Sequence, residues 1–463
     1  MRRHLTAWIA LAALGVGPVV AREAPPPVGP PRPFQLPVNS TFELDNGLSV
    51  TLVPAGAVPK VSIVLALRTG NIADGAKTGL ADLTAAMLKE GAGSHNAAAL
   101  SRLAADMGGA LEASAGADET TIAVDVLSER ASDAIALIAD VVRRPRLPEN
   151  ELARLKSDLA RQAAIARSQA QGVAGDAFAH LLWGEHPYGR TLPTEAGIAS
   201  MTIADVRGFV AREFGAARAH LYIAGRFDSD AVTRAIRAQF GDWARGAPPA
   251  RLPATGSRER IVKLIDRPGA QQTTLLLGLP VPGPMTPGFM SLSLANAVLG
   301  GSLLSRLNLN LREEKGWTYG VHTQIAPFAA GTASWVLETD INAPDTAPAI
   351  SEIFRELERL RTEPLPAEEL RATQNFRAGN FLIGASGRGG LIAQLAFCDL
   401  QNLPADWLTN YAAHVYAVTP EQLENAAASY LDPNAMTLVI VGDLAKLRPA
   451  LVALPALKGA SFQ

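Results

Sequence analysis

Apolar and polar residues alternate along this chain with two different periods, which predict strands and helices in a fixed order. Residues 120–127 place an apolar side chain at every second position, a pattern typical of a strand with one buried face. Apolar residues recur three or four positions apart over residues 132–143 and 149–168, which predicts two long helices. The expected elements before residue 226 are, in order, a hairpin turn at Asn46-Gly47, strands 50–53 and 61–67, a helix pair, strand 120–127, helices 132–143, 149–168 and 203–214, and strand 220–225.

The later part of the chain repeats short segments of the earlier part in the same order. The similar segments are 100–103 with 304–307, 147–152 with 365–370, and 221–225 with 438–442. Self-similarity of this kind indicates a tandem duplication. We therefore expect an α+β fold with two tandem homologous domains, each a mostly antiparallel sheet with helices packed on one face. The expected boundaries are 39–246 for the first domain, 247–258 for a polar linker and 259–463 for the second domain.

The start of the chain has the pattern of an export signal. Arg2 and Arg3 precede an apolar run over residues 5–20, and small residues end that run, which predicts a signal peptide over residues 1–21. A proline-rich leader follows over residues 22–38. No later run approaches the roughly 20 apolar residues that a membrane span needs. We expect an exported protein without a transmembrane segment after signal removal, periplasmic if the cell is Gram-negative.

Charge and cysteine content narrow the functional classes. The 42 basic and 44 acidic residues are interspersed, and no basic run indicates binding to nucleic acid or to an anionic membrane. The one cysteine, Cys398, lies in an apolar run and predicts a buried small side chain rather than a disulfide framework. The stability of the chain must therefore come from burial of its apolar residues.

Residues 79–91, with the sequence GLADLTAAMLKEG, carry the most informative motif of the first domain. Their apolar spacing alone predicts an ordinary amphipathic helix that packs on the core. The frame resembles the zinc-binding helix of the insulinase/pitrilysin peptidases, usually written G-L-A-H-x-x-E-H-M. In that family the two histidines hold zinc and the glutamate activates the bound water. The resemblance implies that Asp82 and Ala86 stand at the histidine positions and Ala85 at the glutamate position.

The resemblance also implies where the third metal position lies. The family supplies a glutamate from a later helix, and aligning residues 147–152 with the start of that helix brings Gln162 to this position. A neutral amide is a poor zinc ligand, so we expect neither metal nor cofactor in this chain. An enzyme that uses Asp82 with another metal would lack a second ligand on the same helix face. The degenerate metal positions are thus Asp82, Ala85, Ala86 and Gln162.

The second domain carries a different motif over residues 300–321, with the sequence GGSLLSRLNLNLREEKGWTYGV. Leu304, Leu307 and Leu311 recur at helical spacing and predict a helix with these three side chains on one stripe. A glycine then ends the helix and a strand follows.

Arg312 and Tyr319 lie seven positions apart at the end of this motif. Pattern alone explains Arg312 as a cation near a helix C-terminus and Tyr319 as an aromatic residue suited to a strand. The stretch also closely resembles the L-R and G-x-Y region of the insulinase/pitrilysin family, whose arginine and tyrosine project into the catalytic chamber from the second subunit. The resemblance implies that Arg312 holds a substrate carbonyl and that Tyr319 donates to the developing oxyanion.

These features lead to one hypothesis and one alternative. The hypothesis is a non-catalytic, zinc-free subunit of a heterodimeric insulinase-family metallopeptidase, not active alone, which binds extended peptide and supplies Arg312 and Tyr319 to its partner. The partner keeps the intact H-x-x-E-H motif and the zinc. The alternative is a peptide-binding or scaffolding protein of the same fold without a catalytic role, although a scaffold has no need of the arginine and the tyrosine.

Overall fold

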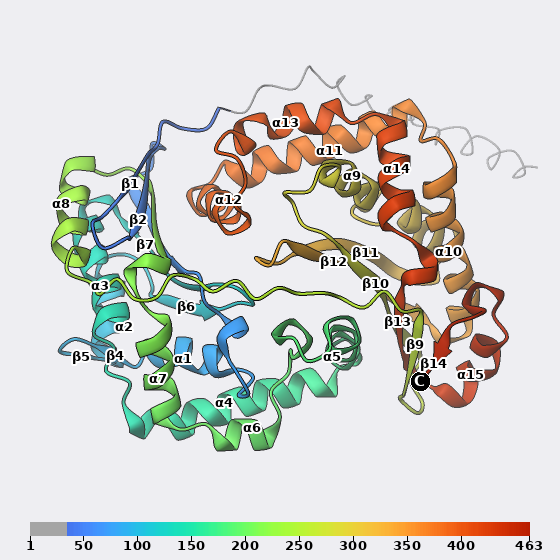
Figure 1. Ribbon diagram of the computed structural model, residues 1–463, viewed down its shortest axis with the longest axis horizontal. Helices are drawn as coiled ribbons and strands as arrows, with labels where there is room; N and C mark the ends of the chain where they lie inside the picture. The colour runs from blue at the N-terminus through green and yellow to red at the C-terminus, as the bar shows by residue number, and fades with distance from the viewer. Residues whose placement is uncertain (1–34) are drawn as a thin grey trace, which may run out of the picture. The chain divides into compact units, whose positions relative to one another are not determined.

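The computed structural model describes residues 35–463, and two six-stranded mixed sheets form its frame (Figure 1). In the first sheet the strand order is β1-β2-β8-β3-β7-β6, and all neighbours are antiparallel except β2 and β8. The apolar residues of β7 alternate into the core, as the sequence predicts. The strands are β1 (Ser40–Glu43), β2 (Ser49–Pro54), β3 (Lys60–Leu67), β6 (Glu112–Ala115), β7 (Thr120–Leu127) and β8 (Ala219–Gly225).

The second sheet repeats the strand order of the first. Listed from β14, the last strand of the chain, the order is β14-β9-β13-β10-β12-β11. In this order β9 corresponds to β2, β13 to β8, β10 to β3, β12 to β7 and β11 to β6. The outer strands differ, because β14 runs parallel to β9 whereas β1 runs antiparallel to β2. The predicted α+β fold with two similar sheets is therefore confirmed. The strands are β9 (Ile261–Asp266), β10 (Gln272–Pro282), β11 (Thr318–Pro327), β12 (Thr332–Asn342), β13 (Thr437–Gly442) and β14 (Ser461–Phe462).

Helices follow the strands in both halves, here called the first half (residues 40–240) and the second half (residues 261–463). In the first half the short strands β4 (Gly91–Ala92) and β5 (His95–Asn96) also pair. The helices of the first half are α1 (Leu80–Leu88), α2 (Ala97–Asp106), α3 (Ala131–Arg143), α4 (Glu149–Ser168), α5 (Ala170–Trp183), α6 (Glu195–Ser200), α7 (Ile203–Glu213) and α8 (Ser229–Phe240). Those of the second half are α9 (Phe289–Leu299), the π-helix η5 (Asn308–Glu314), α10 (Thr346–Thr362), α11 (Ala367–Ala385), α12 (Arg388–Gln401), α13 (Trp407–Ala417), α14 (Pro420–Tyr430) and α15 (Leu444–Val452).

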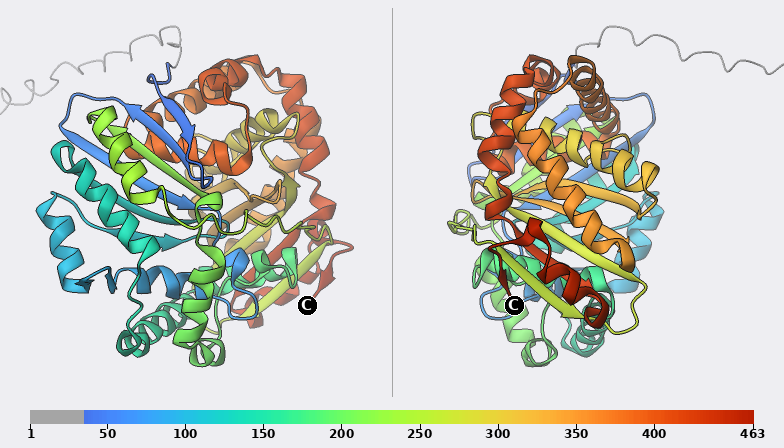
Figure 2. Two further views of the ribbon diagram at one scale, coloured as in Figure 1. Left: turned by 60° about the vertical axis from the view of Figure 1, so that its left-hand side comes forward. Right: turned by 90° about the vertical axis from the view of Figure 1, so that its right-hand side faces the viewer.

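One face of each sheet packs on helices of the same half. In the first half Met87 of α1 and Ile135 of α3 lie in one core with Ile63 of β3, all of them fully buried. In the second half Leu292 of α9 lies in one core with Leu277 of β10. Figure 2 shows the helices of the second half on the outer side of its sheet. Each large aliphatic side chain buried in this way contributes about 1.5–3 kcal/mol to folding.

The other face of each sheet is covered by a helix from the opposite half. Helix α12 of the second half packs on β3 and β8 of the first sheet, where Leu391 and Tyr222 share a small core. Helix α5 of the first half packs on β10 and β13 of the second sheet, where Phe178 lies with Leu276 (Figure 1). Helices of the same half thus cover one face of each sheet, as predicted, and an exchange of helices covers the other.

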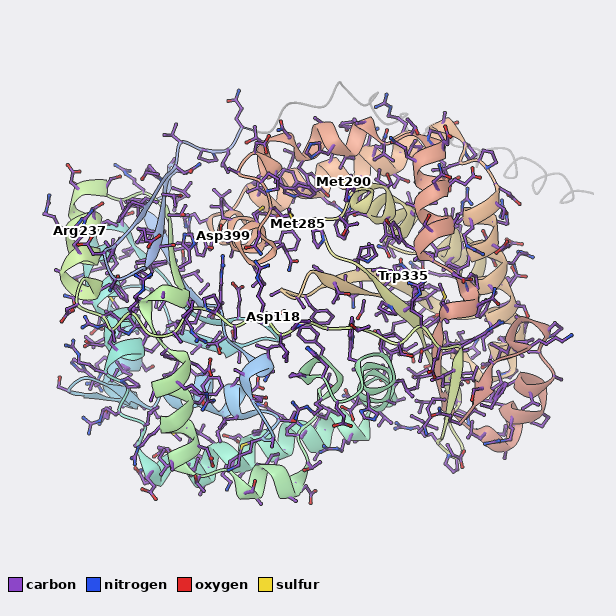
Figure 3. The ribbon with its side chains drawn as sticks, in the orientation of Figure 1. Asp118, Arg237, Met285, Met290, Trp335 and Asp399 are labelled. Atoms are coloured by element: carbon purple, nitrogen blue, oxygen red, sulfur yellow. The ribbon has the colours of Figure 1, made fainter. Side chains whose placement is uncertain are left out.

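Polar contacts also join the two halves. The carboxylate of Asp399 on α12 lies 2.7 Å from Nδ1 of His220 on β8. The carboxylate of Asp118, before β7, accepts a hydrogen bond at 2.9 Å from the backbone N–H of Ala329, between β11 and β12. Figure 3 labels Asp118 and Asp399 where the two halves meet. These contacts tie together segments that are about 200 residues apart in the sequence, so the halves are held by specific bonds as well as by apolar packing.

Several predictions concern the ends and the joint of the chain. The predicted signal peptide (1–21) and most of the predicted leader (22–38) lie outside the described residues. Residues 241–260, which include the predicted linker, form no helix or strand. Among the described residues, no single helix is both long and apolar enough to cross a membrane, although the bent pair α11 and α12, at 111°, meets the length and composition criteria.

Candidate functional site

Helix α1 carries the predicted metal positions, and Asp74 fixes where this helix begins. The Asp74 carboxylate accepts hydrogen bonds at 2.7 Å from the backbone N–H groups of Gly79 and Ala81. Gly79 has a φ of 87°, in the left-handed region that favours glycine. Burial raises the pKa of Asp74 to about 6, and the two N–H bonds offset this rise only in part. Because Asp74 lies five residues before the N-cap, capping rules applied to the sequence miss it.

Three of the four predicted metal positions line one cavity of about 300 Å³ between α1 and α4. Asp82 and Ala86, one turn apart on α1, lie at its wall together with Gln162 of α4. Ala85 is not at this wall; it is 1% exposed and lies inside the protein. The Asp82 carboxylate accepts a hydrogen bond at 2.7 Å from the side-chain amide of Asn71. Desolvation by the surrounding protein raises the pKa of Asp82, and the bond from Asn71 offsets this rise in part.

Charged side chains that pair with one another complete the cavity wall. The Arg154 guanidinium lies 2.6 Å from the Glu90 carboxylate, 2.9 Å from Glu151 and 3.4 Å from Asp158. Arg161 pairs with Asp158 at 2.8 Å. Charge pairs of this exposed kind contribute little to stability, about 0–1 kcal/mol each. They do, however, pair the Glu90 and Asp158 carboxylates of this wall with guanidinium groups.

The residues at this cavity do not fit zinc. A protein zinc site has three or four nitrogen, sulfur or oxygen ligands in tetrahedral geometry. Of the predicted metal positions at this wall, only Asp82 carries a carboxylate, and Asn71 already donates to it. Nowhere in residues 35–463 do three or more His, Cys, Asp or Glu side chains come together in a group that could hold a metal ion. Helix α1 is therefore present, but the side chains around it do not form a set of zinc ligands.

The second half presents Arg312 and Tyr319 side by side. Arg312 lies in the last turn of the π-helix η5, and its Cζ atom lies 5.4 Å from the centre of the Tyr319 ring. Tyr319 is 89% exposed at the start of β11, where a bulge interrupts the strand register. A tyrosine with this exposure does not contribute to the hydrophobic core. Arg312 has one ionic contact among the described residues, to Glu313 at 3.4 Å.

The predicted leucine stripe before Arg312 is wrong at one position. Leu307 and Leu311 are fully buried in the core of the second half. Leu304 is 81% exposed, and Leu303 beside it is 63% exposed. The chain is helical only from Arg306 and π-helical from Asn308 to Glu314, so Leu304 lies in the turn before the helix and not on its buried stripe.

The exposed leucines line a largely apolar cavity of about 730 Å³ between the segment 300–305, β11 and α11. Phe376 of α11 contributes an aromatic ring to its wall, and His322 of β11 and Glu369 of α11 are its titratable residues. A cavity of this size accommodates large apolar side chains. The sequence pattern does not indicate this cavity, because it predicts that Leu304 lies on the buried stripe of a helix.

The two sheets differ at their corresponding edge strands, β6 and β11. The outer edge of β6 has no backbone partner among the described residues, and its side chains are exposed or half-buried. The outer edge of β11 is occupied instead. The side-chain amide of Asn308 bonds to both backbone groups of Val321, and the Thr323 N–H donates to the Gly300 carbonyl at 3.2 Å. An added extended peptide can therefore pair with β6 but not with this part of β11.

Comparison with known families gives two adjacent matches. The family model described as insulinase (peptidase family M16) matches residues 50–195, and the model described as peptidase M16 inactive domain matches residues 200–376. A protein of Mycobacterium leprae, described as an uncharacterized zinc protease, is 25% identical over 410 residues, which cover 87% of this chain and 91% of that protein. A protein of Bacillus subtilis with the same description is 24% identical over 349 residues, 74% of this chain and 83% of its own length.

Two solved structures share the fold over most of the chain. A structure described as a peptidase M16 inactive domain from Pseudomonas fluorescens superposes with a TM-score of 0.82 at 24% identity, covering 87% of this chain and 98% of that one. A protease from Helicobacter pylori superposes with a TM-score of 0.81 at 17% identity, covering 88% of this chain and all of the other. At this level of identity the similarity shows the fold, with its two sheets in the same arrangement.

Proposed function

Since the chain belongs to the insulinase (M16) family of peptidases, we propose that it is the zinc-free subunit of a two-subunit metallopeptidase. In this role it binds extended peptide and supplies Arg312 and Tyr319 to the active site of a partner. The partner carries the intact His-x-x-Glu-His helix and the zinc that activates water for peptide hydrolysis.

The observation that carries this proposal is the contrast between two motifs of one chain. At the metal helix, Asp82, Ala86 and Gln162 still meet at one cavity but offer no ligand set for zinc. At the second motif, Arg312 and Tyr319 remain together at the surface, where neither contributes to the core. A chain that keeps only the second motif can assist hydrolysis at a metal held elsewhere.

The chemistry of the pair suits this role. A guanidinium is a planar, permanently charged donor that can hold a peptide carbonyl or carboxylate, and the phenol can donate to an oxygen on which negative charge develops. Tyr319 is 89% exposed, and its hydroxyl has no hydrogen-bond partner within residues 35–463, so it is free to donate across an interface. One donor of this kind contributes about 3–4 kcal/mol to transition-state stabilisation.

Two features of the surface support peptide binding. The open edge of β6 offers backbone donors and acceptors to an extended chain, as in strand addition. The cavity lined by Leu303, Leu304 and Phe376 offers an apolar pocket on the same half as the Arg312 and Tyr319 pair. A peptide held by its backbone at one place and by a large apolar side chain at another would be bound with little dependence on its full sequence.

The test is capture of the tagged protein from its native cell, followed by mass spectrometry and metal analysis. We expect a partner of the same family at equal stoichiometry, with His-x-x-Glu-His and one zinc per pair. The captured pair should cleave unstructured peptides, and the isolated chain should not.

Recovery of the chain only with itself, free of zinc and inactive, would contradict the proposal. That result would favour the alternative of a peptide-binding or scaffolding protein. Stoichiometric zinc in the isolated chain together with peptidase activity would contradict both.

A further inference from the structure

We propose that Asn308 is a positioning residue, which sets Arg312 and Tyr319 relative to each other and hence to the reacting peptide bond. The catalytic part of this inference rests on the function proposed above; the geometric part concerns this chain alone. Asn308 is 1% exposed and opens the π-helix that carries Arg312. Its side-chain hydrogen bonds go to Ser302, Ser305 and Val321, so it acts through the backbone that bears the arginine and the tyrosine.

The Asn308 side chain joins three segments. Its Oδ1 accepts a hydrogen bond from the Val321 N–H at 2.9 Å, and its Nδ2 donates to the Val321 carbonyl, also at 2.9 Å. Nδ2 also lies 2.9 Å from the Ser302 carbonyl and 3.1 Å from Oγ of Ser305. The amide thus pairs with Val321 as a neighbouring strand would, and it holds the turn before the π-helix. Few other side chains could supply both a donor and an acceptor at this place.

Tyr319 lies in a bulge that ends where Asn308 binds. Thr318 pairs with Ile341 and Val321 pairs with Thr339, so three steps along β11 oppose two steps along β12. Because of the extra residue, Tyr319 and Val321 face opposite sides although they lie two positions apart: Tyr319 is exposed and Val321 is fully buried. The hydroxyl groups of Thr318 and Thr339 hold the Gly320 carbonyl, at 3.0 and 2.9 Å, which closes the bulge on its inner side. Asn308 fixes the outer side at Val321, directly after the bulge.

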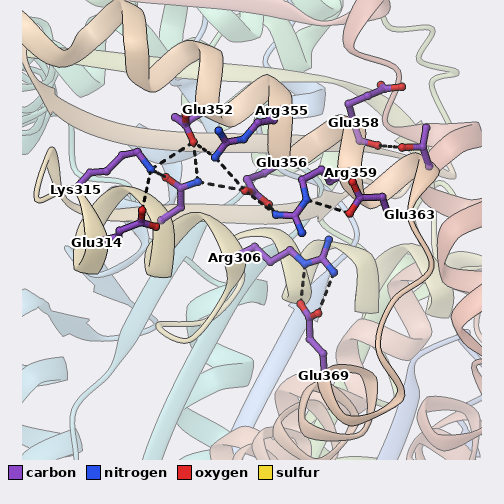
Figure 4. A network of polar contacts seen from close by, with 12 residues as sticks. Arg306, Glu314, Lys315, Glu352, Arg355, Glu356, Glu358, Arg359, Glu363 and Glu369 are labelled. Carbon is purple, nitrogen blue, oxygen red and sulfur yellow. Dashed lines mark hydrogen bonds and ion pairs between the residues drawn. The ribbon is translucent and has the colours of Figure 1, made fainter.

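The π-helix is held on its opposite side by Asn310. The side-chain amide of Asn310 donates to Glu352 at 2.8 Å and to Glu356 at 3.2 Å on α10, and it accepts from Lys315 at 2.7 Å. Figure 4 shows this network, in which arginines of α10 complete the charge pairs. Glu356 is 3% exposed, so the network reaches into the protein. With Asn310 fixing the π-helix on α10 and Asn308 fixing it on β11, Arg312 has little freedom relative to Tyr319.

A short π-helix is uncommon and is often found at functional sites, because its wider turn is less stable than an α-helical one. Here it brings Arg312 within 5.4 Å of the Tyr319 ring. Two donors that act on one substrate must be held within a fraction of an ångström, and a misplacement of about 1 Å can cost roughly 100-fold in rate. Loss of the Asn308 amide releases both the π-helix and the bulge, so it should move the pair and leave the rest of the core in place.

The test compares Asn308→Ala with Asn296→Ala. Asn296 is a matched control, because it is also buried in the second half and also binds β11, donating to the Thr323 carbonyl at 3.2 Å, but it does not touch the bulge. The isolated chain is labelled with 3-fluorotyrosine, and the Tyr319 signal among the six tyrosines is assigned in the ¹⁹F spectrum by its absence in Tyr319→Phe. Values of kcat and KM are then measured with the zinc-bearing partner.

We expect Asn308→Ala to move the Tyr319 signal and to lower kcat roughly 10- to 100-fold, with KM changed by less than about 3-fold. Asn296→Ala should lower the melting temperature without either effect. If Asn308→Ala does not fold, Thr318→Val, which opens the bulge from its inner side, should show the same two changes to a smaller extent.

An unchanged Tyr319 signal in folded Asn308→Ala would overturn the inference, whatever the partner does. Equal losses of kcat in Asn308→Ala and Asn296→Ala would also overturn it, since they would show a general structural role. A different result separates the two proposals. If the signal moves while Arg312→Ala leaves the turnover of the pair unchanged, the positioning of the side chains stands and the proposed function fails.

Discussion

Helix α1 of the first half and the π-helix η5 of the second half differ in what their side chains present to a substrate. Around α1, charged side chains and leucines line a cavity, and the arginines there pair with Glu90 and Asp158. Around η5, two buried asparagines hold a helix whose exposed face carries Arg312 beside Tyr319. Within residues 35–463 the first region offers no group of ligands for zinc, whereas the second presents an exposed tyrosine that does not contribute to the core.

The leucines near Arg312 differ strongly in burial, and their substitution should therefore differ strongly in its effect on stability. Leu311 is fully buried, and Leu311→Ala should destabilise the protein by about 2–5 kcal/mol, since it leaves a cavity in the second core. Leu304 is 81% exposed, and Leu304→Ala should change stability by less than about 0.5 kcal/mol. Urea unfolding measures both values, and similar losses in the two variants would contradict the division into supporting and exposed residues.

The proposal that α1 holds no zinc can be tested by introducing ligands. The variant Asp82→His, Ala86→His and Gln162→Glu should bind zinc, because these three side chains share one cavity. Zinc at 100 times its dissociation constant should stabilise this variant by about 2.7 kcal/mol and should leave the natural chain unchanged. Metal analysis and thermal melting with and without zinc give the answer. Stoichiometric zinc in the natural chain would break the comparison.

The contact between the halves should be sensitive to pH through Glu119. Burial raises the pKa of Glu119 to about 7, aided by Asp118 and Asp399, although Arg68 lowers it. Since this pKa is raised above the value of about 4.3 for an unfolded chain, the stability from neutral Glu119 is present below about pH 4 and is lost as the pH rises through 7.

The corresponding experiment is thermal melting of the natural chain and Glu119→Gln at pH 5 and pH 8. Relative to the natural chain, the free energy of unfolding of the variant should be higher by on the order of 1 kcal/mol at pH 8, where Glu119 is charged, and little changed at pH 5, where it is mostly neutral. The effect is limited because solvent near the carboxyl screens part of its charge. Asp125 provides a reference: burial favours its neutral form, but Lys60, Ser62 and Arg388 together lower its pKa to about 2, so it stays ionised over this range. A gain of equal size at both pH values would contradict the assignment.

The smallest effect is expected at the charge pairs of the cavity. Arg154→Met removes contacts to Glu90 and Glu151, but the arginine side chain is 51% exposed. The expected loss is below about 1 kcal/mol. It should shrink further in 1 M salt, which screens surface charges. A decrease of several kcal/mol in the free energy of unfolding would contradict this expectation and would show that these charge pairs stabilise the fold.

Local patterns in the sequence predict much of this fold. Strand 120–127 and helix 149–168 have the predicted bounds, because their periodicity is unbroken over their full length. The duplication is visible in short repeated segments, and the two sheets repeat it in their strand order. The exchange of α5 and α12 between the halves could not be predicted, since it depends on contacts between residues about 200 positions apart.

The candidate site is less accessible from sequence. The predicted metal positions Asp82, Ala86 and Gln162 do meet at one cavity, but Ala85 does not line it. The leucine stripe fails at Leu304, because this residue lies in a turn before the helix begins at Arg306. Asn308 carries no signal in the sequence, since a buried amide that bonds to a distant strand is indistinguishable there from a polar residue on a helix surface.

Turnover of the reconstituted pair, with and without Arg312, is the most direct test of the central claim. The purified zinc-bearing partner is mixed with the natural chain, with Arg312→Ala, or with Arg130→Ala, which removes an exposed arginine far from the motif in sequence and paired with Asp133. We expect Arg312→Ala to assemble normally and to lose about 100- to 1,000-fold in kcat, while Arg130→Ala matches the natural chain. Equal turnover in all three mixtures would contradict it.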